Sequence, residues 1–272
     1  MSQVIYNSSF KAEYPTNPLE LIDYAVRANS LNSIIIVVPT GKLVRRLKHH
    51  AIRQYFDFHK KPVSSLHFFT LEEFTEYCYD AVFNDRNRNK ISDAYRFALL
   101  EEASDKAGLT FFATSDRRLS PVILEKLSNV IFGLKEDGIK PEDLLKDLQS
   151  EEKGEYHLID ASRLLDVAIL YSKYEELLAN QYLDFPEIQK NITNYIIDNR
   201  DTDIFNEKIL PDKNYILHYG FSDFKQPEVE FISKLSNTKI QFALNIDYSI
   251  FNGPLFGNLV DSINTLTVNG LK

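Results

Sequence analysis

Basic side chains recur at helical spacing directly after residue 41. At about 100° per residue they share one arc of a helix: Lys42, Arg45, Arg46, His49 and Arg53. No acid lies between Thr40 and Phe56. Ammonium, guanidinium and imidazole groups in such a stripe can bind successive phosphates of a nucleic-acid strand. A basic stripe is more often a solvated helix surface, and the sequence alone leaves both interpretations open.

A buried strand is expected directly before this helix. Residues 34–38 are Ile-Ile-Ile-Val-Val, a β-branched run that is typical of a central strand in a parallel sheet. Pro39 ends the strand, because it has no N–H to donate, and Thr40 is a suitable N-cap. The helix then begins at the carboxyl end of the strand, where α/β sheets bind ligands. Its opposite arc is expected to be buried: Leu43, Val44, Leu47, Ala51, Ile52 and Tyr55.

A second strand–threonine–helix unit follows the first. Residues 65–69 predict a short strand, and Thr70 followed by Glu73 has the spacing of a capping box. Phe69 and Phe74 flank this cap, and either ring could stack on a base or pack in the core. Packing is favoured for Phe74, because it lies on the apolar face of the predicted helix.

The chain changes character twice. Residues 86–205 predict an inserted all-helical subdomain, whereas 1–85 and 206–272 carry the strands. Further strands are predicted at 214–218 and 239–246, the first followed by an exit loop at 220–226. The last 20 residues show no clear element, and we expect the chain to be a piece of a longer protein. The predicted fold class is α/β: a parallel sheet whose strands come from two separate parts of the chain, with an inserted helical subdomain between them.

Composition excludes several classes of protein. The chain has 272 residues and a formal net charge of −8, which is too acidic for a protein that coats DNA with its whole surface. Its one cysteine, Cys78, rules out an internal disulfide and a cysteine-based metal cluster built from this chain alone. The sequence shows neither the pattern of a signal peptide nor an apolar run long enough to span a membrane, so we expect a cytoplasmic protein without a membrane segment.

Catalytic signatures are not found. Gly41-Lys42 is followed by Leu43, and no glycine precedes it at P-loop spacing. The adjacent His49 and His50 face apart on a helix and do not suggest a zinc site. Asp223 and Asp247 lie near predicted strand ends, where acids can bind a metal, but such acids more often cap loops. We therefore expect no metal and no cofactor.

Five segments together, in their order and spacing, carry a resemblance to a known family. They are IIIVVPTGKLVRRL, HFFTLEEFTEY, VIFGLKEDGIKPEDL, LLDVAILYSKYEELLANQYLDF and YILHYGFSDFKQPEVEFISKL. The chain resembles the N-terminal part of AddB/RexB-type proteins, the helicase-like subunits of bacterial ATP-dependent helicase–nucleases that process DNA double-strand breaks. The resemblance covers nearly the whole chain and implies an inactivated UvrD-like superfamily-I helicase domain with a P-loop-NTPase-like sheet.

The resemblance also implies roles for single residues. Active relatives have an Asp-Glu pair after the Walker-B strand, and here Tyr219 and Gly220 occupy those positions, so ATP hydrolysis is not expected. Thr40 and Thr70 correspond to threonines that contact single-stranded DNA phosphates, with Phe69 beside the second. The expected partners are single-stranded DNA and an AddA/RexA-type helicase–nuclease subunit. The family's nuclease domain is not found in these residues.

Two other interpretations remain open from the sequence. The chain could be a protein-interaction scaffold without DNA binding of its own, which its net charge favours. It could also be an unrelated α/β enzyme with an unrecognised site.

Overall fold

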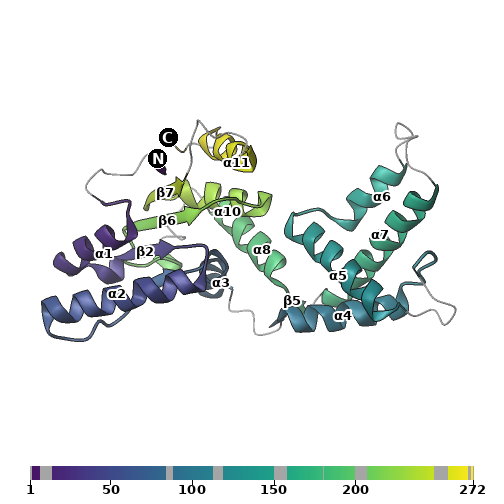
Figure 1. Cartoon of the computed structure of the whole chain (residues 1–272), viewed down its shortest axis with the longest axis horizontal. Helices are drawn as coiled ribbons and strands as arrows, with labels where there is room; N and C mark the ends of the chain where they lie inside the picture. The colour runs from purple at the N-terminus through teal and green to yellow at the C-terminus, as the bar shows by residue number, and fades with distance from the viewer. Residues whose placement is uncertain are drawn as a thin grey trace. The chain divides into compact units, whose positions relative to one another are not determined.

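The chain forms two compact units, shown in Figure 1. The computed structural model describes residues 2–6, 14–83, 88–112, 119–149, 158–179, 181–199, 207–247, 257–268 and 271. The α/β unit comprises residues 1–84 and 189–272, and the helical unit comprises residues 85–188. The second boundary thus falls after residue 188, whereas the sequence suggested residue 205.

The α/β unit is built on a five-stranded sheet with the order β1-β7-β6-β2-β3. Its strands are β1 (Ser2–Tyr6), β2 (Ile34–Val37), β3 (His67–Phe69), β6 (Tyr215–Phe221) and β7 (Gln241–Asp247). β7, β6, β2 and β3 run parallel, and β1 is antiparallel to β7. The predicted α/β class with a mostly parallel sheet is confirmed. β2 lies between β6 and β3 and all four of its residues are buried, as its β-branched sequence indicates.

Helices cover both faces of this sheet. α1 (Pro18–Arg27) and α2 (Gly41–His59) share one core cluster with Ile34, Ile36 and Leu217. On the other face α3 (Leu71–Val82) and α10 (Gln226–Ser236) meet through the rings of Phe74 and Phe231, 6.2 Å apart. The Phe74 ring also contacts His218 of β6. Alternate residues of each strand therefore enter opposite layers of an α/β/α arrangement.

Two predictions about the second half of the α/β unit were wrong. β6 continues to Phe221 rather than ending at His218, because Gly220 adopts φ +79° and forms a bulge against β7 that keeps the strands paired. α11 (Gly257–Val268) occupies a stretch where no element was expected. That stretch contains few strong helix formers, but Ser262 and Leu266 are buried. Packing therefore overrides local propensity there.

The helical unit contains α4 (Asp93–Lys106), α5 (Pro121–Glu136), α6 (Pro141–Gln149) and α7 (Leu158–Leu178). α8 (Phe185–Asp198) begins in this unit and ends in the α/β unit. The core of the helical unit is apolar and aromatic, with Leu100, Ile131, Leu170 and Tyr174 fully buried. The prediction of an all-helical insert was wrong in one detail. β4 (Asn89–Lys90) and β5 (Tyr182–Leu183) form a short parallel pair within it.

No helix in the described part of the chain is long and apolar enough to cross a membrane.

Candidate nucleic-acid interface

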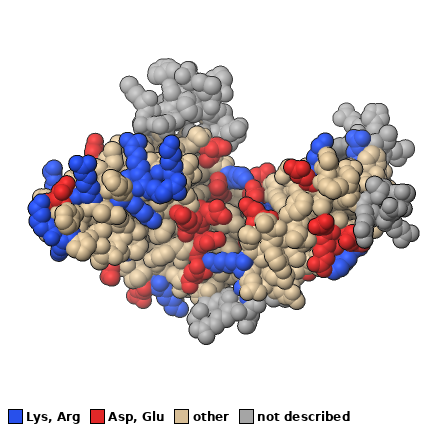
Figure 2. All heavy atoms as spheres, turned by 60° about the horizontal axis from the view of Figure 1, so that its bottom comes forward, with Lys and Arg blue, Asp and Glu red and all other residues tan. Residues whose placement is uncertain are grey.

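The outer face of α2 carries the basic stripe expected from the sequence. All five of its basic side chains are exposed: Lys42, Arg45, Arg46, His49 and Arg53. Figure 2 shows Lys and Arg side chains gathered over the part of the α/β unit where Figure 1 places α1 and α2. Arg53 has an acidic neighbour, Asp57, with Nε and Oδ2 3.9 Å apart, but both side chains are well exposed. Such an exposed pair leaves most of the positive charge available.

Contacts on the opposite face of α2 determine which side of the helix faces the solvent. Val44, Leu47 and Ala51 are buried against the sheet. His50 Nε2 lies 3.1 Å from Asp23 Oδ1 on α1, and the Tyr55 hydroxyl donates to Asn29 Oδ1 at 3.0 Å. His50 therefore belongs to the α1–α2 contact, whereas the adjacent His49 lies on the exposed basic face.

The first turn of α2 combines a capping hydroxyl with a guanidinium group. Thr40 is the N-cap, and its Oγ1 accepts a hydrogen bond from the Leu43 N–H at 3.3 Å. Its own hydroxyl proton remains available to donate. The Nη1 atom of Arg45 lies 3.7 Å from the point where a Cβ on Gly41 would stand, so this guanidinium covers the first turn. A phosphate beside Thr40 would meet a hydroxyl, backbone N–H groups and a cation together.

The corresponding turn of α3 is differently charged. The predicted capping box is confirmed: the Glu73 N–H donates to Thr70 Oγ1 at 3.2 Å, and the Thr70 N–H donates to Glu73 Oε2 at 2.8 Å. β2 and β3 are adjacent, with the Val38 N–H donating to the Phe69 carbonyl at 3.0 Å. Thr40 and Thr70 therefore follow neighbouring strand ends. The carboxylate of Glu73 already occupies the N-terminus of α3, where it repels a phosphate.

The two phenylalanines beside Thr70 lie in an aromatic cluster. Phe74 is fully buried, which confirms that it packs rather than stacks on a ligand. The Phe69 ring is half-buried, and its centroid lies 5.2 Å from that of Tyr77 and 5.9 Å from that of Phe74. Phe69 is thus placed beside Thr70 but is held mainly by neighbouring rings.

Two apolar side chains belong to the basic face and were missed. Ile52 was predicted to be buried, but its side chain is 51% exposed, so that prediction was wrong. Its helical angle lies at the edge of the apolar arc, closer to Arg45 than to Leu47. Phe56, one turn further on, is 54% exposed. The signal was present in the sequence, because Phe56 falls at the same helical angle as the basic residues.

The two residues that the resemblance predicts at the Walker-B positions, Tyr219 and Gly220, lie inside β6. Tyr219 is half-buried and packs against the core cluster shared by α1 and α2. Gly220 forms the bulge and has no side chain. Neither residue offers a carboxylate to a metal ion or to an attacking water molecule. Between the end of β2 and the start of α2 only Val38, Pro39 and Thr40 intervene, too few to form a phosphate-cradling loop.

The two candidate metal-binding acids do not converge on a described site. Asp223 is exposed, and its Oδ1 accepts a hydrogen bond from the Ser222 hydroxyl at 3.2 Å. The side chain of Asp247 lies outside the described residues. Within the described ranges no group of three or more His, Cys, Asp or Glu side chains could hold a metal ion.

A histidine in the sheet of this unit is fully enclosed. His218 of β6 is 0% exposed, and the rings of Phe242 and Phe221 lie 5.1 and 5.9 Å away. Burial lowers the pKa of His218 to about 3, so the ring is neutral in the folded protein at physiological pH. Its role is therefore structural and it adds no charge to the interface.

A scan against protein-family models found no match, and a search of the curated proteins also found none.

Proposed function

We propose that this chain is a non-catalytic, helicase-like module that binds single-stranded DNA along the exposed face of α2. One observation carries the proposal: all five basic side chains of the stripe are exposed on one fixed helix face. From Lys42 to Arg53 this face is about 16 Å long. A nucleic-acid backbone laid along it exchanges condensed counterions for protein cations, which favours binding at low salt.

The apolar side chains on the same face favour single-stranded DNA over duplex DNA as the ligand. Ile52 and Phe56 are exposed among the basic groups, and an exposed ring can stack on an unpaired base. Bases inside a duplex are already stacked and paired. The first turn, with Thr40 and Arg45, is the natural place for one phosphate.

The absence of motor chemistry is part of the proposal. By the resemblance, Tyr219 and Gly220 take the positions at which an active motor needs two carboxylates. The stretch before Ile34, where the phosphate loop would precede β2, contains no glycine. We expect purified protein to show no DNA-stimulated ATPase activity. Release of phosphate from ATP above the protein-free rate, in the presence of single-stranded DNA, would contradict this.

The wider role follows from the resemblance to AddB/RexB-type subunits. In that role the module scaffolds an AddA/RexA-type helicase–nuclease subunit during double-strand-break repair and recombination. A second candidate is a protein-interaction scaffold without DNA binding of its own. The formal net charge of −8 favours the second candidate, because an acidic chain has a weak overall attraction to DNA.

The test measures binding of fluorescein-labelled oligo(dT) by fluorescence anisotropy between roughly 50 and 200 mM salt. We expect the affinity to fall as the salt concentration rises. The Arg45→Glu/Arg46→Glu variant should bind at least about tenfold more weakly, and its slope of log affinity against log salt concentration should be smaller in magnitude by about 1.4. The matched control makes the same charge change at two exposed lysines outside α2, Lys126→Glu/Lys190→Glu. Thermal melting of both variants establishes that each is folded.

The control separates a local site from overall charge. Equal weakening in the two double variants would mean that only net charge matters, and would contradict the α2 interface. A wild-type protein that fails to bind oligo(dT) even at low salt would favour the scaffold.

A further inference from the structure

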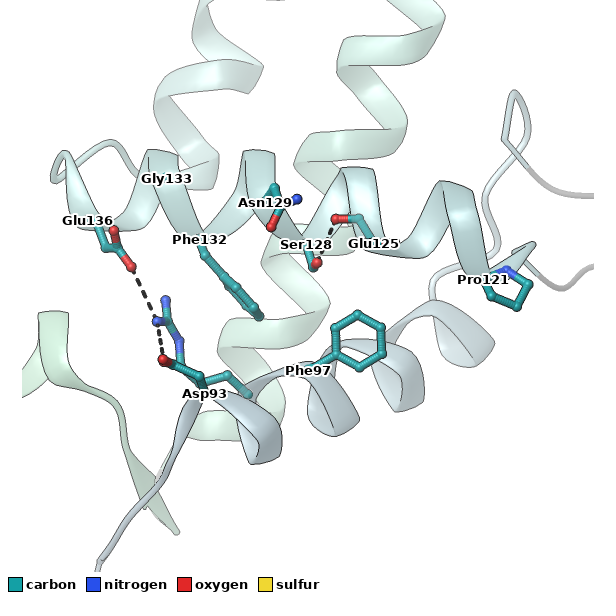
Figure 3. Close-up of a pocket in the computed structure, with 10 residues that line it drawn as sticks. Asp93, Phe97, Pro121, Glu125, Ser128, Asn129, Phe132, Gly133 and Glu136 are labelled. Atoms are coloured by element: carbon teal, nitrogen blue, oxygen red, sulfur yellow. Dashed lines mark hydrogen bonds and ion pairs between the residues drawn. The ribbon is translucent and has the colours of Figure 1, made fainter.

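The helical unit contains an open groove that the proposed DNA interface does not use. It runs between α4 and α5, has a volume of about 690 Å³ and is shown in Figure 3. Phe97 of α4 and Phe132 of α5 point into the space between the helices. The lining extends along α5 from Pro121 to Glu136, a distance of about 22 Å. That length suits a segment of polypeptide better than a single small molecule.

The charges around the groove are mostly negative. Three carboxylates line it, those of Asp93, Glu125 and Glu136. The one cation in the lining is Arg96, whose side chain is only 6% exposed and whose Nη1 lies 3.2 Å from Asp93 Oδ1 and 3.3 Å from Glu136 Oε1. Its guanidinium carbon lies 4.1 Å from the centroid of the Phe132 ring. Arg96 is therefore already neutralised, and the groove has a surplus of negative charge.

The interior of α5 contains a glycine that the helix itself does not need. A Cβ built on Gly133 would meet no heavy atom within 4 Å, so open space lies beside it. A glycine inside a helix destabilises the helix relative to alanine. Gly133 lines the groove, and the missing side chain leaves room for a close approach by a second backbone.

We propose that this groove binds a basic amphipathic segment of a partner protein. The segment would place apolar side chains on Phe97 and Phe132 and direct a lysine or arginine toward Glu125 and Glu136. The lining holds three carboxylates against one arginine, so charge complementarity selects a basic segment over an acidic or neutral one. The proposal is independent of DNA binding, because the groove and α2 belong to different units.

The test uses a labelled, end-capped peptide of leucine and lysine at helical spacing, and a matched peptide of leucine and glutamate. Anisotropy is measured with the full chain. We expect the lysine peptide to bind the wild type and the glutamate peptide to bind at least about tenfold more weakly. The Gly133→Leu substitution fills the groove without a change of charge, and it should weaken binding of the lysine peptide by about tenfold or more.

The control is on the same helix. Val130 is 49% exposed and does not line the groove, so Val130→Leu adds apolar volume elsewhere and should leave the affinity within about twofold. Gly133→Ala separates binding from folding, because it should raise the melting temperature of the protein while it lowers the affinity for the lysine peptide. If Gly133→Leu and wild type bind the lysine peptide equally, or if neither binds it, the proposal is overturned.

Discussion

Arg45 and Gly41 meet across the first turn of α2, with Arg45 Nη1 3.7 Å from the point where a Cβ on Gly41 would stand. The guanidinium therefore lies over the first turn of the helix, where the N–H groups of Gly41 and Lys42 have no intrahelical acceptor. The Thr40 hydroxyl caps the same turn. These groups make the start of α2 the strongest phosphate position in the proposed interface.

The two threonine caps should differ in their effect on DNA binding. Thr40→Ala and Thr70→Ala each remove an N-cap and should each lower the free energy of unfolding by about 1 kcal/mol. Only Thr40→Ala should also weaken oligo(dT) binding, by about threefold to tenfold, because the Glu73 carboxylate keeps phosphate away from Thr70. Urea unfolding and anisotropy measure the two effects. Thr40→Ser should restore both, and a larger binding loss in Thr70→Ala would be the opposite of this expectation.

Removal of the Phe56 ring should weaken DNA binding without altering its salt dependence. Stacking on a base contributes about 1–3 kcal/mol and involves no counterion release. Phe56→Ala should therefore lower the affinity for oligo(dT) by about fivefold or more. The slope of log affinity against log salt concentration should be unchanged. Phe58 is 60% exposed but lies on a different arc of α2, so Phe58→Ala is the matched control. Equal losses in the two variants would argue against a specific stacking position.

Much of the α/β unit could be predicted because local and tertiary signals agree there. The buried β2 run, the Pro39 break and the Thr40 cap all specify one strand and one helix. The capping box of Thr70 and Glu73 likewise fixes the start of α3. The exposed positions of the basic stripe follow from helical periodicity alone, since the apolar arc of α2 has only one sheet to face.

The buried face of α7 could not be predicted for a different reason. Apolar residues occur all around this helix, so periodicity selects no face. Leu165 is apolar but 40% exposed. Asp166, its neighbour, is 1% exposed because its carboxylate accepts hydrogen bonds from the N–H groups of Thr110, Phe111 and Phe112. The groove in the helical unit is equally invisible in sequence, because it depends on how α4 and α5 pack.

Stability should fall as the pH drops below about 6.5, because two histidines are held neutral in the fold. Burial lowers the pKa of His218 to about 3. Burial, together with Lys213 and Lys48, lowers the pKa of His67 to about 4. The unfolded chain binds protons at these sites first, so stability is present above the unfolded pKa and is lost toward the folded one. Each group contributes about 1.4 kcal/mol per pH unit.

Replacement of the buried ring tests this origin. His218→Phe fits the aromatic cluster and should roughly halve the loss of unfolding free energy between about pH 6 and pH 5, measured by urea titration. A pH dependence identical to that of the wild type would assign the effect to other groups.

The helical unit contains a buried ion pair that should tolerate loss of both partners better than loss of one. Lys135 Nζ lies 2.8 Å from Asp184 Oδ2, with the side chains 8% and 0% exposed. The Tyr174 hydroxyl donates to the same oxygen at 3.2 Å. Asp184→Ala leaves Lys135 with Glu175 as its remaining acidic neighbour, 2.5 Å away. Removal of one member of a buried pair costs about 3–5 kcal/mol, whereas apolar replacement of both is often close to neutral.

A double-mutant cycle of Lys135→Met and Asp184→Leu should therefore be strongly non-additive, with the double variant more stable than the sum of the single losses predicts. Urea unfolding of the four proteins gives the coupling. The control cycle uses Lys106 and Glu102, an exposed pair on α4 with Nζ and Oε1 2.5 Å apart. Solvent screens that pair, so its coupling should stay below about 1 kcal/mol. Additive losses at Lys135 and Asp184 would mean that each charge is stabilised by other groups, with Glu175 the first candidate for Lys135.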